Sequence, residues 1–279
     1  MPPPPTDNLR VVKYAQGWGY GASEWERALG AIDWAKPYAE GGPERLKIKT
    51  LPDGTKDATV WRATLTLGKK QHDVVLKVEP IRSFGKKLQA WLHRTKAFRQ
   101  FAGDAVLHSA GIASAKCFAV VRGRSDATDT EMLVLDAVRG LTVLELIGTP
   151  DELTAAALVG DHIRRMYEAR LTNGDTKPSN LIVPNAGGQL VVVDTTDIAK
   201  GADLLSLAGM DEDDIPFMLR DLMLESLGTS RPPRVRSRAM ALRALPADRE
   251  LRRELWQRTA DLIAAHGDPT PKDDPLARG

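Results

Sequence analysis

Apolar and polar residues alternate in several short segments of the first half of the chain, as they do in half-buried strands. Turn residues bound these segments, for example Pro-Asp-Gly-Thr at 52–55 and Gly-Lys-Lys at 68–70. The pattern predicts five antiparallel strands, at residues 45–51, 58–67, 72–78, 115–121 and 132–135.

Apolar residues spaced three and four apart predict helices in the remainder of the chain. The expected helices cover residues 83–107, with a break near Gly103, and then 151–170, 213–227 and 248–265. Strands gathered in one half and helices in the other predict an α+β fold. We expect a small five-stranded lobe with one main helix at 45–138 and a larger helical lobe at 139–268.

The two ends of the chain have a different composition. Residues 1–44 begin with four consecutive prolines and form an extension that we expect to be partly disordered, with a short helix from Ser23. The segment Gly17-Trp18-Gly19-Tyr20-Gly21 resembles a phosphate-binding loop, but no strand leads into it, which favours a flexible turn. Residues 269–279 should form a flexible tail.

Composition and charge narrow the function classes. Apolar residues make up 42% of the chain, which is enough for a core, and the formal net charge of +2 does not favour a nucleic-acid partner. No apolar run approaches the roughly 20 residues of a membrane helix. The single cysteine, Cys117, lies in a strand-like segment and should be a packed thiol. We therefore expect a cytoplasmic protein.

The most informative segment reads Asn-Gly-Asp-Thr-Lys-Pro-Ser-Asn at 173–180, followed by an expected hairpin that ends at Asp194. Phosphoryl transfer needs a carboxylate that orients and deprotonates a hydroxyl, a cation for the phosphate, and oxygen ligands for Mg²⁺. Asp175 can be the catalytic base, Lys177 the cation, and Asn180 and Asp194 the metal ligands. A solvated loop of ordinary turn residues is the alternative interpretation.

Lys77 lies in the middle of the apolar run Val-Val-Leu-Lys-Val at 74–78. A lysine there is costly unless it faces a cleft or a partner, so it is a candidate phosphate contact. The alternative is an edge-strand lysine whose ammonium group extends into water.

Lys77, Asp175, Asn180 and Asp194 occur in the order typical of one superfamily. The chain resembles the protein-kinase-like superfamily, and within it most resembles the lipopolysaccharide core kinases that act on Kdo and heptose. The resemblance rests on the strand lysine, an expected helix end, a hinge-like strand, the catalytic loop and the metal-binding acid, at residues 74–78, 107–112, 132–140, 173–180 and 194.

The resemblance implies a bilobal kinase-like fold and an ATP- and Mg²⁺-dependent phosphotransferase. It assigns Asp175 and Lys177 to catalysis, Asn180 and Asp194 to the metal, and Lys77, Asp136 and Gly54 to the nucleotide. It also implies a hydroxyl acceptor on a small molecule or glycolipid, with peripheral membrane contact if that acceptor is membrane-borne.

The chain departs from the family pattern at several positions. Asn173 replaces the usual histidine of the catalytic loop, only Gly54 represents the glycine-rich loop, and residues 83–107 contain no glutamate to pair with Lys77. These departures leave open a catalytically weak or silent scaffold that binds nucleotide. A small-molecule kinase of the aminoglycoside or choline type shares the same acid and amide pattern.

The segment after Asp194 points away from a protein substrate. Residues 198–207 have a helix-like pattern, and no Ala-Pro-Glu anchor follows them. A short segment would leave the site open to a sugar or another small hydroxyl compound. The arginines between 231 and 258 are balanced by Asp248, Glu250 and Glu254, which favours a charged helix face over an anion-binding surface.

Overall fold

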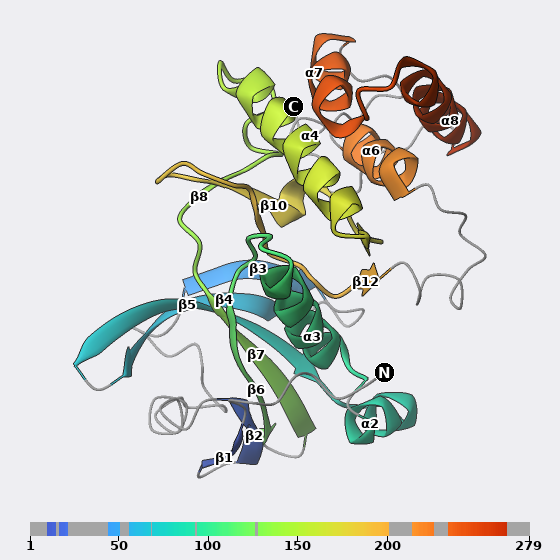
Figure 1. The fold of residues 1–279 in the computed structure, drawn as a ribbon. Coiled ribbons are helices and arrows are strands. Elements are labelled where there is room, and N and C mark those ends of the chain that lie inside the picture. The colour runs from blue at the N-terminus through green and yellow to red at the C-terminus, as the bar shows by residue number, and fades with distance from the viewer. Residues whose placement is uncertain are drawn as a thin grey trace. The chain divides into compact units, whose positions relative to one another are not determined.

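The computed structural model describes residues 10–14, 17–21, 44–50, 56–67, 69–92, 94–125, 128–200, 214–225 and 234–266. The chain divides into two compact units (Figure 1). Unit 1 comprises Met1–Ala105 and Ala115–Ala137, and unit 2 comprises Val106–Ser114 and Val138–Gly279. The expected helix from Ser23, the turn at Gly54 and the tail from Asp268 lie outside the described residues.

Unit 1 contains a seven-stranded antiparallel sheet with strand order β1-β2-β6-β7-β5-β4-β3. Its strands are β1 (Arg10–Tyr14), β2 (Gly17–Gly21), β3 (Glu44–Thr50), β4 (Lys56–Leu67), β5 (Lys70–Pro80), β6 (Cys117–Ser125) and β7 (Thr128–Asp136). The five strands expected from alternation correspond to β3 through β7. The prediction of a five-stranded sheet is wrong, because β1 and β2 extend it beside β6.

The segment Gly17–Gly21 is a strand and not the flexible turn that its glycines suggested. It pairs with β6 from Gly17 opposite Gly123 to Gly21 opposite Ala119. Glycine has low strand propensity, so local preference argued against this assignment. Hydrogen bonding to a strand about 100 residues away in the sequence outweighs that preference.

The two faces of this sheet have separate cores, because successive side chains of a strand point to opposite faces. One face buries Trp61, Val74 and Leu76 together with side chains of β6 and β7. The other face is covered by helix α3 (Lys96–Ser109), whose Phe98 and Phe101 pack with residues of β6 and β7 (Figure 1). Cys117 is a buried free thiol on this second face, as expected.

The long helix expected at 83–107 is two helices, α2 (Phe84–Trp91) and α3. The break falls at 92–95 and not near Gly103, which lies inside α3. The Thr95 hydroxyl accepts a hydrogen bond from the Phe98 amide at 3.4 Å, so Thr95 acts as the cap that begins α3. Capping at Thr95 therefore sets the boundary, while a helix tolerates one interior glycine.

Unit 2 is mainly helical, with α4 (Glu152–Glu168), α6 (Asp214–Glu225), α7 (Arg234–Ala244) and α8 (Arg249–His266) around one core. Small antiparallel sheets join β8 (Gly140–Thr142), β10 (Leu181–Pro184) and β11 (Val191–Val192), and β9 (Leu171–Asn173) with β12 (Ile198–Lys200). The helix-like pattern expected from residue 198 is wrong at its start, because Ile198–Lys200 pairs with β9 as a strand. The chain is thus an α+β protein with antiparallel sheets.

The interior of unit 2 also holds a histidine. His162 of α4 is buried, and its pKa is lowered to about 4 because burial disfavours the charged imidazolium.

Membrane spans are absent from the described residues. No helix among them is long and apolar enough to cross a bilayer.

Helices α4 and α7 approach closely at Gly160. A Cβ atom there would lie 2.4 Å from the Met240 carbonyl oxygen and 2.5 Å from the Arg243 Cβ atom. We expect Gly160→Ala to lower the free energy of unfolding by about 1–3 kcal/mol, because overpacking outweighs the gain in helix propensity. Chemical denaturation followed by circular dichroism measures the change. Gly85→Ala is the control, since a Cβ at Gly85 of α2 has nothing within 4 Å, and an equal response of both variants would contradict the prediction.

Candidate functional site

The segment 173–180 forms a tight loop between α4 and the hairpin of unit 2. It starts at the buried strand β9 and ends in a 3-10 helix, η1 (Pro178–Asn180), directly before β10. The Asn173 Oδ1 atom accepts a hydrogen bond from the Asp175 amide at 3.0 Å, and the buried Thr176 hydroxyl donates to the Asn173 carbonyl at 2.8 Å. Asn173 is itself buried, so it braces the loop from inside.

Both carboxylate oxygens of Asp175 have partners within the loop. The Lys177 ammonium lies 2.9 Å from Oδ1, and the Asn180 side-chain amide donates to Oδ2 and to the Asp175 backbone carbonyl, each at 3.2 Å. The Asp175 side chain is about one third exposed, at 34%. The structure therefore brings Asp175, Lys177 and Asn180 into one cluster in which the acid is oriented and still accessible.

Asp194 lies on a second segment that runs beside this loop. The Val193 amide donates to the Asn180 carbonyl at 2.9 Å, and the Gly174 amide donates to the Asp197 carbonyl at 3.0 Å. These two backbone hydrogen bonds hold the 173–180 loop next to the segment 193–197. The Asp194 Oδ1 atom accepts hydrogen bonds from the Thr196 amide at 3.2 Å and the Thr196 hydroxyl at 2.6 Å, which orients the carboxylate.

Asn180 and Asp194 are chemically suited to Mg²⁺. The Asn180 amide nitrogen faces Asp175, which places its Oδ1 oxygen on the opposite side of the amide group. Magnesium bound with a nucleotide commonly takes one or two protein oxygens, and phosphates and waters complete the octahedron. No cluster of three or more His, Cys, Asp or Glu side chains is found among the described residues. The donor set thus fits a metal that arrives with phosphate oxygens.

Lys77 belongs to unit 1 and has a specific partner there. The alternation of β5 puts Val74 and Leu76 on one face of the sheet and Lys77 on the face that α3 covers. The Lys77 ammonium donates to the side-chain oxygen of the buried Gln100 on α3 at 2.9 Å. The edge-strand interpretation does not apply, because β5 lies between β4 and β7.

Gln100 was not predicted as a site residue, because the resemblance implied a glutamate partner for Lys77 in this helix. The one acid there, Asp104, is buried and accepts a hydrogen bond from the Cys117 amide at 2.9 Å. Gln100 lies one turn before Asp104 on the same helix. Its position in the apolar series of Ala97, Phe98 and Phe101 was the only signal in the sequence, because a polar residue on a packed face needs a partner.

The other two residues expected to bind nucleotide are not gathered with Lys77 by any described contact. Asp136 ends β7, is exposed, and donates its backbone amide to the Lys116 carbonyl at 2.9 Å. Gly54 lies outside the described residues. Their assignment to the nucleotide stays a prediction.

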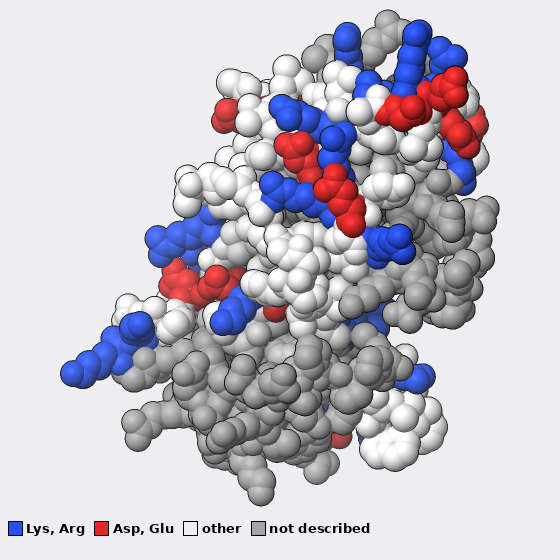
Figure 2. Space-filling view, in the orientation of Figure 1, with Lys and Arg blue, Asp and Glu red and all other residues white. Residues whose placement is uncertain are grey.

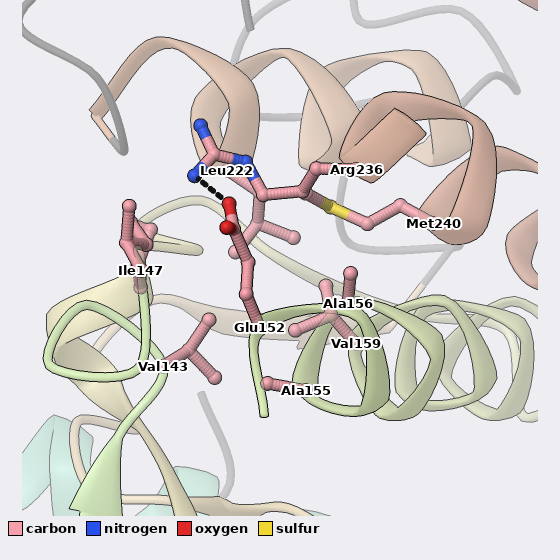
Figure 3. A pocket seen from close by; sticks show the side chains of 10 residues that line it. Val143, Ile147, Glu152, Ala155, Ala156, Val159, Leu222, Arg236 and Met240 are labelled. Carbon is pink, nitrogen blue, oxygen red and sulfur yellow. Dashed lines mark hydrogen bonds and ion pairs between the residues drawn. The ribbon is translucent and has the colours of Figure 1, made fainter. Parts of the chain in front are cut away.

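A hollow lies within unit 2, and Pro178 of the 173–180 loop is part of its lining (Figure 3). Glu152 of α4 and Arg236 of α7 meet in it, with 2.6 Å between the Glu152 Oε1 and Arg236 Nη1 atoms. The remaining lining is Val143, Ile147, Ala155, Ala156, Val159, Pro178, Leu222 and Met240. Burial lowers the pKa of Arg236 while the Glu152 carboxylate raises it, and burial is the larger effect.

The similarity between this chain and known proteins is low. No family model matches the chain, and no curated protein sequence matches it. One solved structure, described as WaaP in complex with acyl carrier protein, is similar over 78% of this chain and 85% of that one, with 17% sequence identity and a TM-score of 0.42.

Proposed function

We propose that the chain is an ATP- and Mg²⁺-dependent phosphotransferase that acts on a hydroxyl group. The observation that carries this proposal is the loop in which Lys177 and Asn180 orient Asp175, beside the segment that presents Asp194. Asp175 would accept the hydroxyl proton as the acceptor oxygen attacks the γ-phosphorus and ADP leaves. Lys177 would neutralise the transferring phosphate, and Asn180 and Asp194 would hold the metal.

In unit 1, Lys77 is the residue proposed to bind nucleotide phosphates. Protein kinases pair this lysine with a glutamate, and here the Gln100 side-chain oxygen accepts a hydrogen bond from it at 2.9 Å. This contact orients the ammonium group, whose positive charge attracts phosphate.

The departures from the kinase pattern, Asn173 and the lack of glutamate in residues 83–107, support a second candidate function, a kinase-type module that binds nucleotide without turnover. In this alternative, Lys77 binds ATP with its ammonium group oriented by Gln100, and the loop at 173–180 transfers no phosphate. For the active enzyme, we propose an acceptor hydroxyl on a lipopolysaccharide-type sugar, and the competing acceptor is a small molecule such as an aminoglycoside or choline. The use of ATP would place the reaction in the cytoplasm.

Thermal shift and ATP turnover on the same preparation separate these functions. We expect ATP with Mg²⁺ to raise the melting temperature, and we expect slow ATP hydrolysis that rises with Kdo- or heptose-containing acceptors. Lys77→Ala should lower ATP affinity by about tenfold or more, since a charge-assisted hydrogen bond contributes roughly 1.5–3 kcal/mol. Lys86→Ala is the matched control, because Lys86 is a unit 1 lysine whose ammonium group likewise contacts a side-chain oxygen, that of Glu79 at 2.6 Å.

Each outcome of this experiment has a defined meaning. Binding without turnover on any acceptor would favour the nucleotide-sensing module. Turnover on aminoglycosides or choline alone would move the acceptor to that class. Absence of any ATP-dependent shift, with the wild type and Lys77→Ala indistinguishable, would overturn both functions.

A further inference from the structure

Helix α2 presents its large apolar side chains to solvent and packs on the protein through Ala90 and, in part, Lys86. Phe84 is 82% exposed and Trp91 is 75% exposed, and Leu88 and Leu92 are nearly half exposed. Successive helical residues are rotated by about 100°, so these four side chains fall within one arc of about 100°. The only buried residue of α2 is Ala90, on the opposite face.

The opposite face is also held by a polar contact. Lys86 lies on that face, and its ammonium group is 2.6 Å from the Glu79 carboxylate of β5. The Ser83 hydroxyl caps the helix by accepting from the Lys86 amide. The Ser83 cap, the Lys86–Glu79 ion pair and the buried Ala90 therefore fix the orientation of α2 in which the apolar stripe faces solvent.

The surroundings of the stripe are strongly basic. Residues 81–103 contain no aspartate or glutamate. Four basic side chains next to or within α2 are exposed: Arg82, Lys87, Arg94 and Lys96. Figure 2 shows an uncharged surface at the lower right, where Figure 1 places α2, with basic side chains and an acidic one at its edge.

We propose that the surface formed by Phe84, Leu88, Trp91, Leu92 and the four basic residues binds an anionic lipid bilayer. Phe, Trp and Leu enter the boundary between headgroups and acyl chains, while Lys and Arg contact lipid phosphates. An eight-residue helix is only about 12 Å long, too small for the roughly 800 Å² per partner of a stable protein interface. A nucleic acid would match the charge but leave the apolar stripe in water.

Vesicle co-sedimentation of the full chain tests this surface without nucleotide, so its outcome does not depend on the proposed activity. We expect binding to vesicles that contain phosphatidylglycerol to be at least about tenfold stronger than to pure phosphatidylcholine, and to weaken as salt is raised. The double variant Phe84→Ser/Trp91→Ser should lose at least about tenfold in binding. Its folding should be unaffected, since both side chains are exposed.

The matched control is Leu242→Ser/Trp256→Ser, which removes an exposed leucine and an exposed tryptophan from unit 2. Unchanged vesicle binding by this control, with loss in the α2 variant, supports the proposal. Equal binding of the wild type to both vesicle types would overturn it, and so would full retention of binding in the α2 variant. A self-associating wild type that ignores vesicles, and becomes monomeric in the α2 variant, would instead assign this surface to a second copy of the chain.

Discussion

Asp175→Asn is expected to lower turnover by about 10²- to 10⁴-fold, which is the usual contribution of a positioned general base. Asparagine has nearly the same shape, so the loop between β9 and η1 should persist. Its amide cannot accept the hydroxyl proton, and its NH₂ group would face either Lys177 or Asn180, both of which donate to the carboxylate. The affinity for ATP should change little, because the nucleotide contacts are proposed for other residues.

Single-turnover kinetics and calorimetric titration with a non-hydrolysable ATP analogue measure the two quantities separately. Asp161→Asn is the control, as Asp161 is an accessible acid on α4 whose ion-pair partner among the described residues, Arg243, lies 3.9 Å away. This control should stay within about twofold of the wild type, as expected for a surface substitution. Unchanged turnover in Asp175→Asn would remove Asp175 from the mechanism, and loss of binding together with turnover would indicate a structural role.

Glu152→Ala should be the most destabilising single substitution in unit 2, with a loss of about 3–5 kcal/mol in the free energy of unfolding. The Arg236 side chain is only 3% exposed, and within the described parts of the chain its acceptor is Glu152, at 2.6 Å from Nη1. The Nε and Nη2 atoms of Arg236 find no hydrogen-bond partner among the described residues. Removing the carboxylate would leave a buried guanidinium without a counter-ion.

Arg236→Met gives the opposite expectation for the same contact. Methionine has a similar length, fits the apolar lining seen in Figure 3, and removes two donors that have no acceptor. Its cost should be below about 1 kcal/mol, because a buried ion pair often contributes little relative to an apolar replacement. The double variant Glu152→Ala/Arg236→Met should therefore recover most of the loss caused by Glu152→Ala alone.

Urea denaturation of the four proteins gives the coupling free energy between the two residues. Glu152→Gln separates charge from shape, since its side-chain oxygen can still accept from Arg236, and it should fall between the wild type and Glu152→Ala. The interpretation of Arg236 as an under-neutralised buried cation would be refuted by a loss below about 1 kcal/mol in Glu152→Ala, or by a double variant no more stable than that single variant.

Local patterns predicted the parts of the fold that depend on near neighbours. Alternation located β3 through β7, and spacing of three and four located α4 and α8 within two residues at each end. The hairpin expected between residues 181 and 193 is present, with Leu181 opposite Val192. Turn residues and periodicity act over a few positions, so they can be read without knowing what packs against them.

Contacts between distant segments could not be read in this way. The glycines of β2 looked like a turn until pairing with β6 made them a strand, and the partner of Lys77 is a neutral glutamine on another element. Glu152 and Arg236 are 84 residues apart and neither carries a motif. The outward face of α2 has ordinary helical spacing, and only its exposure distinguishes it from a core helix.

The amino-acid order alone therefore defined the chemical groups of the loop, from Asp175 to Asn180, and the short-range elements that present them. The orientation of Asp175 by Lys177 and Asn180, the glutamine beside Lys77, and the choice of which apolar residues are buried came from three-dimensional packing. The reason is physical: periodicity and turn chemistry are properties of adjacent residues, whereas hydrogen-bond partners and burial depend on segments that only the folded chain brings together.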